Sequence, residues 1–85
     1  YLAQFYLGQC YQKIGRDEDA ARSFKRSINL NPDDPESHYA MGLVYIRLNK
    51  LRSARKELNI LQILDPVLRD SLEYYLTQIE IKSEE

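Results

Sequence analysis

The side chains that could carry out catalysis or bind a metal are few and scattered along this sequence. It has one cysteine, Cys10, and one histidine, His38, and they are far apart in the chain. A lone histidine without cysteines or clustered carboxylates makes a poor metal site. Asp70 and Glu73 would share one face of a helix, but no nucleophile or phosphate-binding loop accompanies them. We therefore predict no catalytic, cofactor or metal site, with Cys10 as a small buried apolar residue and His38 in a packing or partly exposed role.

The basic residues could instead contact nucleic acid, because several of them recur along the chain. They are Arg16, Arg22, Lys25 and Arg26, followed by Lys50, Arg52, Arg55 and Lys56. Glu18, Asp19 and Glu57 interrupt this row, so a solvated outer face is the better interpretation. The net charge is only −1 and no long apolar run is present. We expect neither nucleic acid nor membrane insertion.

The composition fits one small globular domain of 85 residues, 44% apolar and 29% charged. A single cysteine excludes an internal disulfide but does not fix the compartment. No export signal is visible, which leaves the cytoplasm as the default compartment. The chain begins at Tyr1, inside an apolar-periodic segment with no capping residue before it. We therefore expect it to be part of a longer protein.

The sequence matches itself when it is shifted by 34 residues, so any binding surface must be built from a repeat. The identical pairs are Gly8 with Gly42, Tyr11 with Tyr45, Ala20 with Ala54, Leu30 with Leu64 and Pro32 with Pro66. Conservative pairs, such as Leu7 with Met41 and Phe24 with Leu58, join them. The shared positions are small or apolar and fall at helical spacing, which makes the repeat significant.

Each repeat predicts two antiparallel helices joined by a short turn. Gly15 ends the first helix, while Asp34 and Asp65 are N-cap residues followed by a proline in the first turn. The expected helices are about 2–14, 17–30, 35–48, 50–64 and 66–82. Within each repeat we expect Gly8 with Ala20, and Gly42 with Ala54, to let the two helices cross closely.

This pattern resembles the tetratricopeptide repeat, a helix–turn–helix unit of about 34 residues. The matching packing positions are Leu7, Gly8, Tyr11, Ala20, Phe24 and Pro32 in the first unit, and Met41, Gly42, Tyr45, Ala54, Leu58 and Pro66 in the second. Gln4, His38, Ser27 and Leu61 depart from the family's usual residues. The resemblance implies an all-α fold in which antiparallel repeats 1–34 and 35–68, with a capping helix at about 66–82, stack as an α-solenoid of about five helices.

The resemblance also implies a non-catalytic protein-interaction scaffold with a concave groove. Its partner-binding residues would be Phe5, Tyr6, Gln9, Glu36, Tyr39, Leu43, Arg47, Asp70 and Tyr74. The other residues that would face the groove are Leu2, Gln12, Lys13, Ala40, Ile46, Glu73, Thr77, Glu80 and Ile81. Aromatic side chains at its centre suit a binding hot spot. The acidic edge at Glu36, Asp70, Glu73 and Glu80 suggests a peptide with an apolar anchor and a nearby basic residue.

One subtype of the family can be tested residue by residue. Family members that hold the acidic tails of chaperones carry cations and asparagines at positions occupied here by Phe5, Gln9, Ala40, Asp70 and Tyr74. None of these is cationic, so we expect no such carboxylate clamp. Alternatively, the segment is a structural spacer in a larger repeat array, or it self-associates through the edge of residues 1–14. The identity of the partner cannot be inferred from a repeat fold.

Overall fold

The structure, a computed structural model, describes residues 1–84 and contains five helices and no strand in that range. The helices are α1 (Leu2–Lys13), α2 (Asp17–Leu30), α3 (Pro35–Arg47), α4 (Leu51–Leu64) and α5 (Pro66–Glu84). Their bounds lie within about two residues of those expected, and the all-α helical-repeat class is confirmed. No described helix combines the length and apolarity needed to cross a bilayer.

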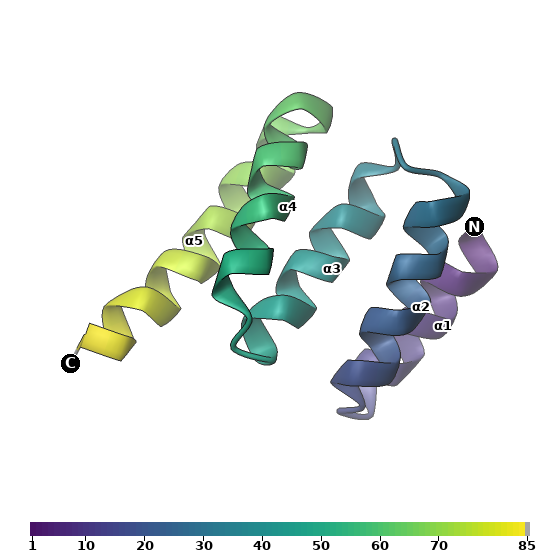
Figure 1. Cartoon of the computed structure of the whole chain (residues 1–85), viewed down its shortest axis with the longest axis horizontal. Coiled ribbons are helices and arrows are strands. Elements are labelled where there is room, and N and C mark those ends of the chain that lie inside the picture. Colours follow the sequence, from purple (N-terminus) through teal and green to yellow (C-terminus); the bar gives the residue numbers. More distant parts are fainter. Residues whose placement is uncertain (85) are drawn as a thin grey trace.

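The helices form two layers in an elongated molecule of 39 × 29 × 17 Å. In Figure 1, α1 lies behind α2, α5 passes behind α4, and α3 lies between the two pairs. The N-terminus and the C-terminal end lie on opposite sides of this view. Because α3 packs against helices of both pairs, it joins the two halves of the structure.

The turns inside the two repeats have the same backbone geometry. Gly15 and Asn49, which occupy equivalent positions in the two repeats, both have positive φ, at 80° and 60°. The next residue in each turn donates its N–H back to a tyrosine carbonyl, Arg16 to Tyr11 at 2.9 Å and Lys50 to Tyr45 at 2.8 Å. This is the Schellman ending of a helix, which glycine and asparagine favour at the left-handed position. The expected stop at Gly15 is confirmed.

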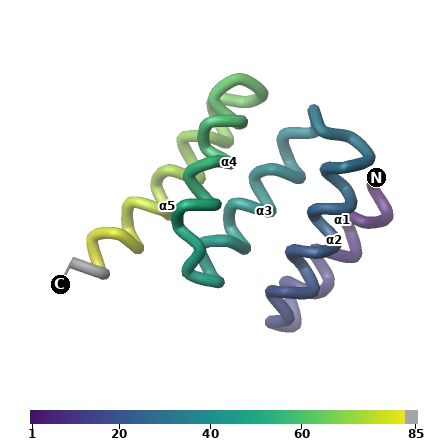
Figure 2. The backbone as a smooth tube through the Cα atoms, viewed as in Figure 1, coloured from purple at the N-terminus to yellow at the C-terminus, as the bar shows by residue number. Residues whose placement is uncertain are grey.

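The starts of α3 and α5 are fixed by aspartate caps. Asp34 accepts a hydrogen bond from the Ser37 N–H at 3.3 Å, and Asp65 accepts from the N–H groups of Val67 and Leu68. A proline follows each aspartate in the first helical position, where its missing N–H is not needed. The α5 helix begins at the position equivalent to Pro32, three residues before the equivalent of Pro35. Figure 2 shows the resulting tight turn between α4 and α5.

Two apolar clusters form the core, one on each side of α3. The first joins α1, α2 and α3 through Phe5, Ala20, Phe24, Ala40, Met41 and Val44. The second joins α3, α4 and α5 through Ala54, Leu58, Leu61, Leu72 and Leu76, with Leu43 and Ile46 of α3 packed against it. Tyr45 packs against both clusters. Removing this much apolar surface from water stabilises the fold and holds α3 in one orientation.

The two repeat glycines make close contacts of different kinds. A Cβ at Gly8 would lie 2.6 Å from Cε1 of Phe24, so α1 and α2 meet there as expected. A Cβ at Gly42 would lie 2.5 Å from Cδ2 of Leu72, which belongs to α5. The close contact at Gly42 therefore involves α5, a neighbour that the repeat pattern did not predict. The nearest neighbour of Gly42 comes from the next helix along the solenoid, because Leu72 fills the space that the missing side chain leaves.

We predict that Gly8→Ala lowers the free energy of unfolding by up to about 2 kcal/mol, measured by urea denaturation. The added methyl would overlap the ring of Phe24, which is fully buried and has no space to move into. Overpacking of this kind costs about 1–3 kcal/mol. Better helix propensity returns about 1 kcal/mol of that loss.

The matched control is the same substitution in a Phe24→Leu background. Leucine occupies the equivalent position, Leu58, in the second repeat, so it fits the fold. It should relieve the overlap, and Gly8→Ala should then be close to neutral. An equal loss in both backgrounds would show that the Phe24 contact is not the cause.

Candidate protein-binding surface

A hollow of about 440 Å³ opens along α3 and α5, with one residue from α1 at its edge. Its lining is Gln12 from α1, then Tyr39, Leu43, Ile46 and Arg47 from α3, and Tyr75, Gln78, Ile79 and Lys82 from α5. We call this hollow the groove. Its wall is mainly apolar and aromatic, with polar and cationic groups added at a few points. Such a combination suits a protein segment that inserts an apolar side chain and makes a few oriented polar contacts.

The structure brings together only part of the predicted set of groove residues. Tyr39, Leu43 and Arg47 line the groove as the repeat pattern predicted, as do Gln12 and Ile46. Phe5 is only 8% exposed, and its ring packs 5.8 Å from that of Phe24, so it belongs to the core. The remaining predicted residues lie outside the lining: Tyr6, Gln9, Glu36, Asp70 and Tyr74.

The groove residues of α5 differ from those that the repeat period predicts. The period points to Asp70, Glu73 and Tyr74, with Thr77, Glu80 and Ile81. The observed stripe is Tyr75, Gln78, Ile79 and Lys82, which follows the i, i+3, i+4, i+7 spacing of one helix face. Leu72 and Leu76 are fully buried and set the rotation of α5. Since Leu76 replaces the repeat glycine, α5 cannot dock as α1 and α3 do, and a different face borders the groove.

Two tyrosines from different helices lie next to each other in the groove wall. Burial raises the pKa of the Tyr39 phenol, and the neighbouring Tyr75 raises it further. Tyr75 also makes an edge-on ring contact with Tyr74, with centroids 5.6 Å apart. Tyr74 itself is 62% exposed and lies outside the lining. The two adjacent tyrosines of α5 therefore differ in their relation to the groove.

The groove continues into a second, more polar hollow of about 600 Å³. Gln12 and Arg47 line both, and Lys13, Ile14 and Gly15 complete the second. Arg47 bonds through its Nε to Asp17 of α2, with the nearer carboxylate oxygen 3.1 Å away, and its side chain stays half exposed. This part of the surface is therefore cationic, with one carboxylate partly offsetting it.

The acidic edge that suggested a basic partner is largely neutralised by arginines of the chain itself. Arg69 pairs with both Asp70 and Glu73 on α5. Glu80 pairs with Arg55 of α4. None of these acids lines the groove, whereas Arg47 and Lys82 do. The geometry therefore does not support the expectation of a basic residue beside the anchor.

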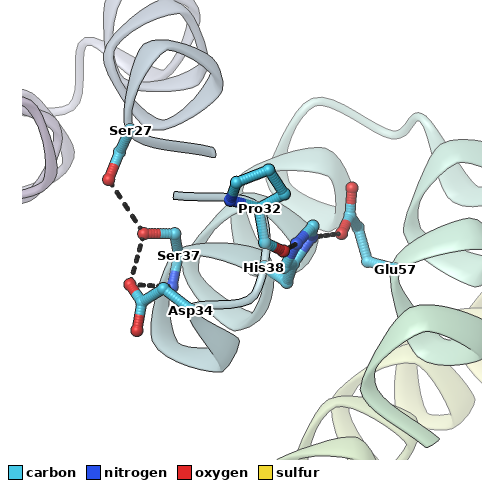
Figure 3. A network of polar contacts seen from close by, with 6 residues as sticks. All are labelled: Ser27, Pro32, Asp34, Ser37, His38 and Glu57. Carbon is cyan, nitrogen blue, oxygen red and sulfur yellow. Dashed lines mark hydrogen bonds and ion pairs between the residues drawn. The ribbon is translucent and has the colours of Figure 1, made fainter. Parts of the chain in front are cut away.

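Apart from the groove, a buried polar network joins the loop before α3 to α3 and α4 (Figure 3). His38 and Glu57 are 4% and 9% exposed. Nδ1 of His38 lies 2.7 Å from Oε2 of Glu57, and Nε2 of His38 lies 2.7 Å from the carbonyl oxygen of Pro32. The placement of Glu57 on a solvated face was wrong, and His38 does occupy a packing position. No sequence signal links two residues that lie 19 positions apart on different helices.

The Pro32 carbonyl determines how protons are distributed in this pair. A carbonyl oxygen can only accept, so Nε2 of His38 must carry a hydrogen. Nδ1 and the Glu57 carboxyl then share one further proton, as an ion pair or as a neutral pair. Burial raises the pKa of Glu57, and the hydrogen bond and charge of His38 partly oppose that rise. Burial and the nearby Glu57 also raise the pKa of Tyr45.

A chain of hydroxyl groups extends the network to α1. Ser37 Oγ donates to the Asp34 carboxylate at 2.7 Å. This distance is shorter than the 3.0 Å between Ser37 Oγ and Ser27 Oγ, and a carboxylate is the stronger acceptor. Ser27 Oγ lies 3.0 Å from Ser37 Oγ and 3.1 Å from the carbonyl oxygen of Tyr1. Ser27 donates to the Tyr1 carbonyl, and because the two hydroxyls carry one hydrogen each for three contacts, one of these hydrogens is shared between two acceptors. These bonds explain why a serine is retained at a fully buried position of α2.

Comparison with known proteins gives two matches. The family model described as TPR repeat matches residues 8–49, just under half of the chain, from the middle of α1 through the whole of α3. The chain belongs to the tetratricopeptide-repeat family. It is also 33% identical over 66 residues, 78% of its length, to a protein named Cellulose synthase operon protein C from Pseudomonas fluorescens (strain SBW25). The match covers only 5% of that protein, and no solved structure matches significantly.

Tetratricopeptide repeats are in general protein–protein interaction modules, and the family is typically non-catalytic. Most of the packing positions that define the repeat are buried or half-buried here: Gly8, Tyr11, Ala20, Phe24, Met41, Gly42, Tyr45, Ala54 and Leu58. Pro32 and Pro66 are exposed, and Pro32 contributes its carbonyl to His38. Leu7 is 40% exposed, and Cys10 is exposed rather than buried as predicted. Both lie on a side of α1 that no described helix covers.

We predict that Glu57→Gln changes how stability depends on pH. A carboxyl whose pKa is raised on folding holds its proton more tightly in the folded state. The stability of the wild type relative to the variant should therefore fall as pH rises from 4.5, the ordinary value for Glu57, through the raised pKa. The glutamine amide can still donate to Nδ1 of His38, so the variant should fold. The measurement is urea unfolding at a series of pH values between about 4.5 and neutral.

The matched control for this prediction is Glu18→Gln, an exposed glutamate in the first turn of α2. It should not reproduce the fall in relative stability with rising pH, because an ionised carboxylate in the first turn favours the helix dipole. If wild type and Glu57→Gln respond to pH identically, or if their difference grows with pH, the assignment of the buried pair is wrong.

Proposed function

We propose that this segment is a non-catalytic scaffold that binds a partner protein segment in the groove between α3 and α5. The observation that supports this proposal is the apolar and aromatic hollow with its few polar groups. Tyr39, Leu43 and Tyr75 supply the type of surface on which binding energy concentrates. Tyrosine offers a large contact area with one polar tip, so it can anchor a partner and orient it.

The proposal gives this segment no catalytic or metal-dependent role. Within residues 1–84, no group of three potential metal-ligating residues lies together. The buried His38–Glu57 pair is enclosed by α3, α4 and the Pro32 loop, and it is not part of the groove lining. Its role in this proposal is to hold α3 in position. The proposal includes no cofactor, no nucleic-acid site and no carboxylate clamp for chaperone tails.

We predict that Tyr39→Ala and Tyr75→Ala each weaken partner binding by about tenfold or more, as loss of a hot-spot side chain does. Ligands can be selected from a displayed library of random peptides and measured by fluorescence anisotropy. Tyr74→Ala is the matched control, because Tyr74 neighbours Tyr75 but lies outside the groove lining. It should change affinity by less than about threefold.

The affinities of the three variants for the selected peptides distinguish the groove from other surfaces. If Tyr74→Ala weakens binding as strongly as Tyr75→Ala does, the face expected from the repeat period is the binding face. If all three variants bind as the wild type does, while circular dichroism shows them folded, the groove is not the site.

A second candidate function is self-association, or stacking with a further repeat, through α1. The repeat allows a direct comparison, since Leu7 and Cys10 are equivalent to Met41 and Val44. The α2 helix helps to bury Met41 and Val44, whereas Leu7 and Cys10 are exposed. The face formed by these two residues, with Leu2, Tyr6 and Ile14 also exposed on the same segment, therefore suits contact with another helix.

We predict that the average mass of the isolated segment rises with concentration in light scattering, and that Leu7→Lys abolishes this rise. A lysine on the face would leave a charge buried without a partner in the dimer. Lys25→Leu, on the exposed side of α2, is a control that alters hydrophobicity elsewhere. A strict monomer at all concentrations would rule out self-association and leave the face to a further repeat.

A further inference from the structure

Three cationic side chains gather where the groove meets the second hollow. Lys13 is in the last turn of α1, Arg47 in the last turn of α3 and Lys82 in the last turn of α5. Arg47 lines both hollows, Lys82 lines the groove, and Lys13 lines the second hollow. Three segments far apart in the sequence thus place positive charge at one end of a continuous depression.

Helix geometry alone does not explain this arrangement. A cation in the last turn complements the negative end of a helix dipole, which accounts for each residue by itself. However, α2 and α4 have no basic residue in their last turns. Only the three helices that border the two hollows carry one.

The three cations are largely available to a partner. Lys13 and Lys82 are exposed and form no ion pair with a described residue. Arg47 uses only its Nε on Asp17, so most of its five N–H donors are not engaged by that carboxylate. No carboxylate is among the described lining residues of either hollow, and of the three cations only Arg47 is paired with a described residue, Asp17, so the lining here carries a net positive charge.

We propose that the groove takes a protein segment with an apolar anchor followed by acidic side chains, the anchor lying between α3 and α5 and the acids beside Lys13, Arg47 and Lys82. This inference rests on the proposed function and names the chemistry of the partner. The anchor is matched by Tyr39, Leu43, Ile46 and Ile79. The acids match the cationic end by charge complementarity, which favours the correct partner and raises the association rate.

The test uses three labelled peptides with amidated C-termini. They share one anchor of phenylalanine and leucine, and differ only in the run that follows, which is glutamate, glutamine or lysine. Fluorescence anisotropy at low salt should show the glutamate peptide binding about three- to tenfold tighter than the glutamine peptide. This magnitude is that of one or two partly exposed ion pairs. The preference should shrink at high salt, because exposed charges are screened.

Charge reversal supplies the matched variants. In Lys13→Glu/Lys82→Glu the lysine peptide should bind better than the glutamate peptide. Lys25→Glu/Lys56→Glu makes the same charge change at exposed positions of α2 and α4, away from both hollows. It should keep the preference for glutamate, since its charges lie outside the depression.

The outcomes separate this inference from the proposed function. Equal binding of the three peptides, or strongest binding of the lysine peptide, would overturn the inference and leave the groove as an apolar site. A glutamate preference that needs a free C-terminal carboxylate would also overturn it. If no peptide binds the folded wild type at any salt concentration, the anchor site itself is wrong and the proposed function fails with it.

Discussion

The structure depends on α3 packing against neighbours on opposite sides. One side of α3 contributes Ala40, Met41 and Val44 to the first core, and the other meets α4 and α5 through Leu43, Tyr45 and Ile46. Gly42 lets Leu72 approach closely enough to seal the second core. A helix held on two sides cannot rotate, so the residues on its remaining surface have fixed directions. The groove exists because Tyr39, Leu43 and Arg47 share that surface.

The sequence predicted the features that depend on local chemistry. The stop at Gly15, the caps at Asp34 and Asp65 and the order of five helices all follow from turn and capping preferences. The α3 half of the groove was also predictable, because two full repeats define its register. The α5 half was not, since Leu76 replaces a glycine there and the helix turns to bury it.

The buried pair of His38 and Glu57 was missed for a different reason. A glutamate in a polar, strongly amphipathic helix is expected to face water, and only the tertiary fold brings its partner from 19 residues away. The pair links α4 to α3 and, through the Pro32 carbonyl, to the loop before α3. It thereby fixes the helix that supplies most of the groove, although it is not part of the binding surface.

The early start of α5 has a consequence for the path of the solenoid. From α1 to α3 the chain advances by one sequence repeat, and a regular solenoid would relate α3 to α5 by the same rotation and translation. The single-residue link at Asp65 and the rotation set by Leu72 and Leu76 break that operation. A helix packed next on α5 would meet a surface turned away from the one that α3 offers to α4. The groove between α3 and α5 therefore lies where the geometry of the repeat changes.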